Sequence, residues 1–214
     1  GEEYDKDVAN AIRYAGDNGA NIINMSFSKW MSQREKWVQK ALAYAEKKGV
    51  LLVRGAGNSS INADSITLYP KPYIGKRRIR SFLIVGASDV QGNPAIFSNF
   101  GQKQVDVFAP GESINSTVSG NKYSQQGGTS MASPIVAGVV AILMAYYPEL
   151  SAIQVKNIIM QTAVTRRGDT VSRSLGYSLY SGTVQIPFAS LCIAGGIVNA
   201  YEAVKMADQI VNKR

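Results

Sequence analysis

The residues best suited to covalent chemistry lie in the octapeptide 127–134, Gly-Gly-Thr-Ser-Met-Ala-Ser-Pro. Ser130 begins an apolar stretch that predicts a helix from residue 130 to about residue 146. The first N–H groups of a helix are unpaired and its dipole is positive there, so an oxyanion forming beside Ser130 would be stabilised. Small neighbours leave room for a substrate backbone. The alternative is that Thr129 or Ser130 only caps the helix.

A second residue with a chemical use is Asn58, which ends the sequence Gly-Ala-Gly-Asn at 55–58. A carboxamide can donate an N–H to developing negative charge without needing a proton, and losing such a donor costs about 10²–10³ in rate. The alternative is a turn residue, since Gly-Asn pairs favour turns. A dinucleotide-binding motif is excluded because Ser60 stands where the third glycine is required.

Hydrophobic periodicity places these residues in an α/β fold. Apolar strands that alternate with amphipathic helices predict a mostly parallel sheet with helices on both faces. The polar stretch 166–187 has no clear period and is interpreted as a loop or hairpin insertion. The expected helices are 4–18, 33–48, 130–146, 151–162 and 198–211, and the expected strands are 21–26, 50–53, 81–87, 105–108 and 113–118.

Composition indicates one domain with an apolar core, since 45% of the 214 residues are hydrophobic and only 18% are charged. The net charge of +8 comes from scattered basic residues, so we expect no nucleic-acid partner. The longest apolar stretch, 135–147, is too short to predict a membrane span. Cys192 is the single cysteine and therefore has no partner for an internal disulfide.

The heptapeptide 128–134 resembles the nucleophile motif of the subtilisin-like serine proteases, the subtilases. The resemblance extends to segments 97–101, 106–111, 139–162 and 196–200. It implies that residues 1–214 are part of a subtilisin-like catalytic domain that is incomplete at its N-terminal side. Residues 166–193 have no recognised counterpart and are predicted to be an insertion.

The same resemblance implies a role for each matching residue. Ser130 would be the acylated nucleophile and Asn58 the side-chain oxyanion donor. The segment 26–28 resembles the family's Ser-Leu-Gly, which pairs with the substrate backbone, although Ser28 replaces the glycine and Phe27 is bulkier than leucine. We expect no cofactor and no metal site. The residues expected to bind substrate are Ser26, Phe27, Ser28, Gly55, Ala56, Gly57 and Thr129.

The sequence departs from the family pattern because it contains no histidine, whereas a subtilase needs a histidine base and an aspartate that orients it. In the family both motifs lie upstream, so we expect them in an absent N-terminal region of about 100 residues, which is an ordinary domain size. We therefore expect a serine endopeptidase fragment that is inactive alone. No lysine near Ser130 supports a Ser–Lys dyad.

Four further expectations concern the function, the partners, the location and the residue Arg54. The alternative to an endopeptidase is a non-catalytic pseudoprotease module that binds peptides or a partner chain. Since an unpaired sheet edge invites pairing, we expect either the missing N-terminal part or a second copy to pair with residues 1–60. The family resemblance implies a secreted or periplasmic protein. Arg54 follows three apolar residues and is interpreted as exposed at a strand end, the alternative being a charge directed toward the missing half.

Overall fold

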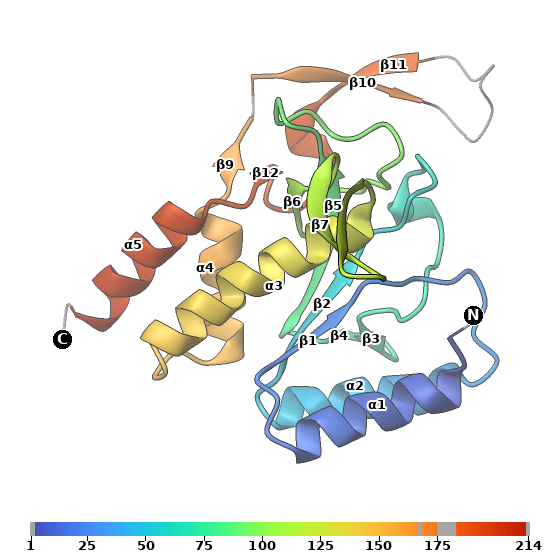
Figure 1. Cartoon of the computed structure of the whole chain (residues 1–214), viewed down its shortest axis with the longest axis vertical. Helices are drawn as coiled ribbons and strands as arrows, with labels where there is room; N and C mark the ends of the chain where they lie inside the picture. The colour runs from blue at the N-terminus through green and yellow to red at the C-terminus, as the bar shows by residue number, and fades with distance from the viewer. Residues whose placement is uncertain (1–2, 167, 175–182, 213–214) are drawn as a thin grey trace.

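The computed structural model describes residues 3–166, 168–174 and 183–212, and a six-stranded sheet lies at its centre (Figure 1). The order β1-β2-β5-β6-β12-β9 is parallel except for β9, which runs antiparallel to β12. The predicted mostly parallel α/β sheet is therefore confirmed, with β1 at one edge. The strands are β1 (Ile22–Met25), β2 (Leu51–Gly55), β5 (Phe82–Ser88), β6 (Val107–Pro110), β12 (Gly196–Ile197) and β9 (Val164–Thr165).

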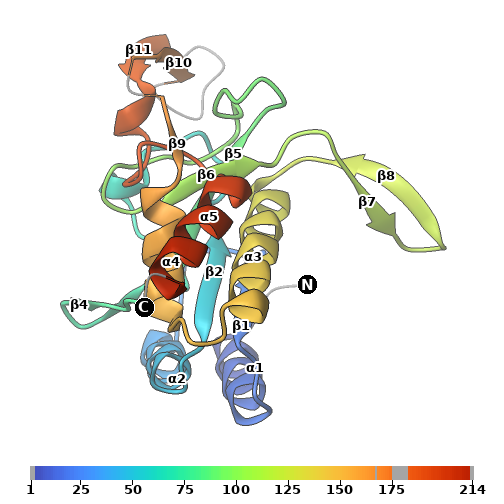
Figure 2. The same cartoon turned by 90° about the vertical axis from the view of Figure 1, so that its left-hand side faces the viewer.

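Helices cover both faces of this sheet, as the strand pattern predicts (Figure 2). Successive strand side chains point to opposite faces. Leu52 accordingly packs in the core cluster that contains α1 and α2, whereas Val53 packs in the cluster of α3, α4 and α5. The helices are α1 (Asp5–Asp17), α2 (Glu35–Lys47), α3 (Thr129–Tyr146), α4 (Ala152–Gln161) and α5 (Ala200–Val211).

Helix α3 is the central helix of its face and carries Ser130 in its first turn. By length and composition alone it is apolar enough to cross a membrane, unlike the shorter stretch considered above. Its buried stripe, which includes Ala132, Val136, Val140 and Leu143, packs against the sheet, and α3 contacts β1, β2, β5 and β6. This packing against strands accounts for the apolar composition of α3.

The smaller elements form hairpins around the sheet. The polar strands β7 (Ile114–Val118) and β8 (Lys122–Gln126) pair antiparallel, project from the body and lead directly into α3 (Figure 2). A shorter hairpin joins β3 (Tyr73–Ile74) to β4 (Arg77–Arg78). Strands β10 (Thr170–Ser174) and β11 (Thr183–Pro187) also pair antiparallel. Because 167 and 175–182 lie outside the described residues, the insertion at 166–193 stays a prediction.

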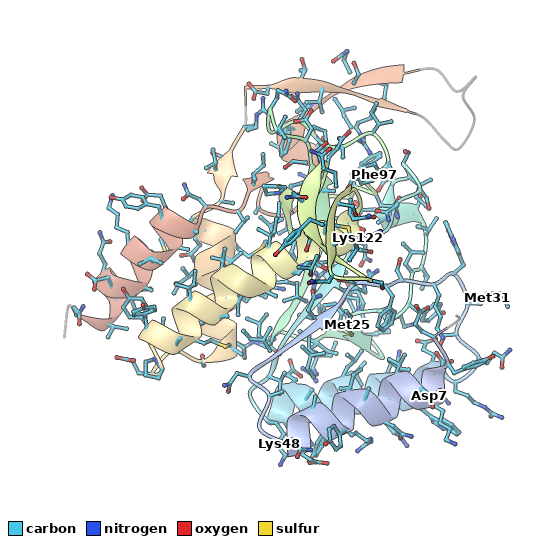
Figure 3. All side chains as sticks on the ribbon, viewed as in Figure 1. Asp7, Met25, Met31, Lys48, Phe97 and Lys122 are labelled. Atoms are coloured by element: carbon cyan, nitrogen blue, oxygen red, sulfur yellow. The ribbon has the colours of Figure 1, made fainter. Side chains whose placement is uncertain are left out.

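The segment between β1 and α2 runs from the core to the surface. Figure 3 shows its course from Met25, which is 2% exposed, to Met31, which is 77% exposed. Halfway along, Lys29 and Tyr69 exchange two backbone hydrogen bonds of 2.9 Å. The segment 26–28 is therefore fixed at both ends, by the sheet on one side and by this bridge on the other.

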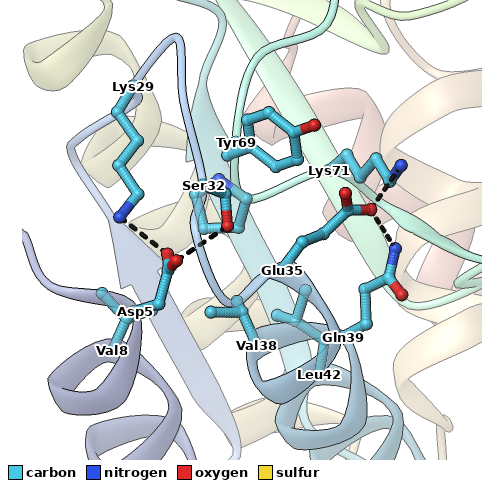
Figure 4. Close-up of a pocket in the computed structure, with 11 residues that line it drawn as sticks. Asp5, Val8, Lys29, Ser32, Glu35, Val38, Gln39, Leu42, Tyr69 and Lys71 are labelled. Atoms are coloured by element: carbon cyan, nitrogen blue, oxygen red, sulfur yellow. Dashed lines mark hydrogen bonds and ion pairs between the residues drawn. The ribbon is translucent and has the colours of Figure 1, made fainter.

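Asp5 holds the same segment against the start of α1 (Figure 4). Its Oδ2 accepts hydrogen bonds from the Ser32 hydroxyl at 2.9 Å and the Arg34 amide at 2.7 Å, and Lys29 Nζ lies 2.7 Å from its Oδ1. Burial, the largest influence, raises the pKa of Asp5, but the bonds from Lys29, Arg34 and Ser32 together bring that pKa below its usual value. The carboxylate is thus a charged anchor with an almost fully buried side chain.

We expect Asp5→Asn to lower the free energy of unfolding at neutral pH by about 1–3 kcal/mol, because a neutral amide leaves the Lys29 ammonium without its counter-charge. Since the folded pKa of Asp5 is depressed, its contribution is complete above about pH 4 and is lost as pH falls through the folded pKa. Urea unfolding across this range measures the effect. The exposed Asp7→Asn in the same turn is the control, and equal losses for the two variants would disprove the anchor.

Candidate active site

Ser130 lies beside the segment that follows β1. Its Oγ donates a hydrogen bond to the carbonyl oxygen of Ser26 at 2.8 Å, and the Ser26 hydroxyl donates to the carbonyl of Ser130 at 2.9 Å. Ser26 Oγ also lies 3.2 Å from the hydroxyl of the buried Ser133. The first turn of α3 is therefore tied to the carboxyl end of β1 through both serines.

Asn58 is attached to the same turn through Thr129. The Asn58 Oδ1 accepts hydrogen bonds from the backbone N–H and the hydroxyl of Thr129, each at 2.9 Å. Because a backbone N–H can only donate, the oxygen end of the carboxamide must face Thr129. The Nδ2 end of Asn58 is thereby turned away from Thr129, and it has no hydrogen-bond acceptor among the described residues.

Two N–H donors border one space beside Gly128. A Cβ placed on Gly128 would lie 3.4 Å from Asn58 Nδ2 and 3.6 Å from the backbone nitrogen of Ser130. The amides of Met131 and Ala132 bond to the Gly128 carbonyl, but the Ser130 amide has no acceptor in the described part of the chain. With φ of 154° and ψ of 159°, Gly128 has a backbone conformation that is essentially restricted to glycine. Glycine thus keeps open a space in which an oxyanion can meet both donors.

An open cavity of about 290 Å³ joins these groups. The two predicted segments 26–28 and 55–58 form its facing walls. A Cβ on Gly57 in one wall would lie 3.3 Å from Ser28 Oγ in the other. The predicted residues that line it are Ser26, Phe27, Ser28, Gly55, Gly57, Asn58, Thr129 and Ser130. The lining residues that sequence reasoning missed are Glu3, Trp30, Ser59, Leu68 and Asn99.

Ala56 is the predicted substrate-binding residue that does not line this cavity. It is 1% exposed and instead lines a separate cavity with Arg54. The chain remains extended at the end of β2, so its side chains alternate, and Gly55 and Gly57 face the Ser130 cavity while Arg54 and Ala56 face the other side. The Ala56 side chain therefore lies outside the Ser130 cavity, and the substrate-binding role predicted for Ala56 stays a prediction.

The glycines beside Asn58 are explained by close contacts. A Cβ on Gly55 would lie 2.9 Å from both the carbonyl oxygen and the hydroxyl of Thr129. Gly57 has φ of 98°, donates its N–H to Thr129 Oγ1 at 3.0 Å, and has Asn99 Nδ2 only 2.5 Å from the position of a Cβ. The end of β2 can approach α3 this closely only without a side chain at Gly55, and Gly57 likewise lets Asn99 lie against the backbone.

Asn99 fixes the loop that carries Asn58. This fully buried side chain accepts hydrogen bonds through Oδ1 from the amides of Ser59 and Ile61, at 2.9 and 3.2 Å, and donates through Nδ2 to the Ala56 carbonyl at 3.0 Å. The segment 97–101 matches the family pattern, but nothing in one sequence indicates which backbone groups an asparagine will bridge.

Arg54 is buried at 3% exposure, so its interpretation as an exposed residue at a strand end is wrong. Its position in β2 directs it to the same face as Leu52, where α1, α2 and the loop before β5 cover the sheet. The guanidinium Nη1 donates to the Gly55 carbonyl at 2.9 Å. A single sequence cannot distinguish this burial from exposure, because Gly55 and Ala56 are small residues that do not show which face of the strand is covered.

No side chain that lines the cavity accepts a hydrogen bond from the Ser130 hydroxyl. The chain has no histidine, and none of the residues that line the cavity is lysine, so a Ser–Lys dyad gains no support. Glu3 is the one charged residue in the lining. The Ser130 hydroxyl donates its proton to the Ser26 carbonyl, which cannot act as a base at neutral pH.

Comparison with known proteins identifies the same similarity over most of the chain. The model of the Subtilase family matches residues 1–178. Subtilisin DY from Bacillus licheniformis is 38% identical over 164 residues, which cover 76% of this chain and 56% of that protein. Thermophilic serine proteinase from Bacillus sp. strain AK1 is 37% identical over 198 residues, which cover 92% of this chain and 41% of that protein. The chain thus spans about half the length of these relatives.

The solved structures show the same fold. The PatG macrocyclase in complex with peptide superimposes with a TM-score of 0.70 and 28% sequence identity. The match covers 95% of this chain and 57% of that one. The subtilisin-like fold that the sequence predicts is confirmed.

Gly55→Ala is expected to lower the free energy of unfolding by about 1–3 kcal/mol, because the new methyl group collides with the Thr129 backbone. The control is Gly138→Ala, since a Cβ at that exposed position in α3 meets no atom within 4 Å. It should leave stability unchanged or raise it by up to about 1 kcal/mol. Urea unfolding measures both variants, and a loss in Gly138→Ala as large as that in Gly55→Ala would contradict the packing argument.

Proposed function

Because this chain belongs to the subtilase family, we propose that it carries the nucleophile of a serine endopeptidase. The observation that carries the proposal is the shared space of Ser130 and Asn58, which are joined through Thr129. Ser130 Oγ attacks the substrate carbonyl carbon while a general base takes its proton, and the oxyanion of the resulting tetrahedral intermediate lies beside Gly128, between Asn58 Nδ2 and the Ser130 amide. Collapse of the intermediate breaks the C–N bond, the amine leaves with the proton from the base, and the acyl-enzyme on Ser130 is then hydrolysed by water.

The substrate is a peptide, which we propose binds as an extended strand along residues 26–28. Strand pairing between β1 and β2 ends at Met25, and the next backbone bridge begins at Lys29. The main-chain groups of Phe27 and Ser28 take part in no backbone hydrogen bond within the described residues, so they can pair with a peptide. A structural relative, the PatG macrocyclase, was solved in complex with a peptide, which supports a peptide as the ligand.

The general base must come from polypeptide outside this sequence, since no histidine is present. We propose that the N-terminal part of the same domain supplies it and docks along β1, the strand at the sheet edge. An apolar cavity of about 460 Å³ lies there between α1 and β1, and its lining includes Ala11, Ile12, Ala15 and Ile23. A homodimer through residues 1–60 is the alternative occupant of this edge.

A non-catalytic module that binds a peptide or partner chain is the second functional candidate. The names of the relatives, which are proteinases and subtilisins, do not favour it. A secreted or periplasmic location remains part of the proposal and rests on family resemblance alone.

The proposal predicts that a fluorophosphonate probe labels Ser130 stoichiometrically only when the chain is folded together with its upstream polypeptide. The isolated chain should label slowly, because its serine lacks a base and its hydroxyl proton is held by Ser26. Mass spectrometry of the labelled peptide measures both cases. Light scattering of the same samples distinguishes a one-to-one complex from a homodimer.

Two serine variants make this labelling experiment decisive. Ser130→Ala should abolish labelling, whereas Ser116→Ala on the exposed strand β7 should leave it unchanged. Rapid stoichiometric labelling of the isolated chain would refute the need for an external base. Upstream sequence without an aspartate and a histidine motif in frame would favour the non-catalytic module.

In the completed enzyme, Asn58→Ala should lower kcat by about 10²–10³ with little change in KM, because the carboxamide donates mainly in the transition state. Asn10→Ala, which removes an exposed carboxamide from α1, is the matched control and should leave both constants unchanged. Steady-state hydrolysis of a peptide substrate measures this. An Asn58→Ala enzyme with unchanged kcat would remove Asn58 from the oxyanion site.

A further inference from the structure

A second polar cavity lies on the other side of the β2 end from Ser130. It has a volume of about 220 Å³, and Leu68 is the one residue that also lines the Ser130 cavity. Exposed residues such as Thr67 and Gly75 form part of its lining, so it opens to the surface. The lining contains two cationic side chains, Arg54 and Lys71, and no carboxylate. Nothing in the proposed peptidase reaction uses this cavity.

Arg54 lines this cavity, and part of its guanidinium has no protein partner in the described part of the chain, although Nε itself has less than 1 Å² of accessible surface. Its Nη1 is occupied by the Gly55 carbonyl, at 2.9 Å. The buried Nε has no hydrogen-bond partner, and Nη2 has none among the described residues either. Nε and Nη2 lie on the same side of a guanidinium, so the edge that remains is the one that binds two oxygens of a carboxylate or phosphate in parallel.

The charges around Arg54 do not balance. The carboxylate whose charge stabilises the Arg54 cation is that of Asp106, whose Oδ2 accepts from Arg78 at 2.7 Å and from the Ile84 amide at 2.8 Å. The other oxygen, Oδ1, lies 3.0 Å from Lys156 Nζ. Three buried or half-buried cations therefore share one carboxylate whose oxygens are already engaged, and Arg54 makes no ion pair among the described residues.

Arg54 remains a cation at neutral pH despite this environment. Burial lowers its pKa to about 10, and repulsion from Arg78 acts in the same direction, while attraction to Asp106 opposes both. Lys71 cannot take the place of a counter-ion, because it is also positive and pairs with Glu35. The cavity is large enough for several waters, but neutral water would leave the positive charge of Arg54 uncompensated.

The geometry points to a binding site for a small oxyanion, a phosphate or a free carboxylate, held by the Nε–Nη2 edge of Arg54. The neutral polar side chains Thr67, Tyr73 and Gln104 line the same cavity and can donate to the remaining oxygens. Occupancy would supply the missing negative charge beside Arg54. It would also steady the end of β2, where Arg54 Nη1 bonds to the carbonyl of the glycine that packs on Thr129.

The test is titration of the protein with inorganic phosphate at constant ionic strength, followed by calorimetry and by the thermal midpoint. We expect saturable binding and a rising midpoint in the wild type. Arg54→Met should weaken binding by about tenfold or more, and Arg54→Lys should also weaken it, since lysine keeps the charge but loses the two-donor edge. The control is Arg77→Gln, which removes an exposed arginine and should bind phosphate as the wild type does.

A measurement on the unaltered protein keeps the test decisive if Arg54→Met does not fold. The ¹⁵N–¹H resonance of Arg54 Nε should shift with phosphate and with acetate, but not with chloride at equal ionic strength. An equal rise of the thermal midpoint with chloride would disprove a site that requires two oxygens. Absence of saturable binding in the wild type, or binding of equal strength in Arg54→Met, would overturn the proposal. Because none of these measurements follows peptide hydrolysis, the result is independent of the proposed function.

Discussion

The candidate site depends on the close approach between the end of β2 and the first turn of α3. Thr129 is the centre of that contact, since its hydroxyl and amide both donate to Asn58 while its hydroxyl also accepts from the Gly57 amide. Gly55 makes the approach sterically allowed. The proposed nucleophile and the proposed oxyanion donor come from segments about 70 residues apart, and this contact aligns the two segments.

Other interactions hold the elements that meet at Thr129. Asn99 fixes the loop after β2, because its side chain forms hydrogen bonds with backbone groups on both sides of Asn58 in the sequence. Asp5 fixes the segment after β1 through its bonds to Ser32 and Arg34. The parallel sheet places both segments at the carboxyl ends of their strands, the usual position of sites in open α/β sheets. The site is therefore a property of the sheet edge as well as of the motif around Ser130.

The sequence predicted the regular elements because their hydrophobic periods are strong. Strand β8 was missed since residues 122–126 are mostly polar and pair with β7 away from the core, and β3, β4, β9 and β12 were missed because two residues are too few to show a period. Eight of the nine candidate residues line one cavity. They could be chosen from the sequence because the seven-residue motif identifies the family specifically enough to align the other segments with it. The exception, Ala56, and the buried Arg54 share one cause. Which face of a short extended segment is covered depends on loops that are distant in sequence, and no local pattern records them.

The hydrogen bond between Ser130 Oγ and the Ser26 carbonyl has a consequence for reactivity. A hydroxyl has a single proton, and here that proton is committed to a main-chain acceptor that will not remove it. Before an imidazole can accept this hydrogen bond, the Ser130 side chain must rotate so that its hydroxyl no longer donates to the Ser26 carbonyl. With this hydrogen bond in place, Ser130 is not activated as a nucleophile. Its activation requires a change of hydrogen-bond acceptor and no refolding of the surrounding chain.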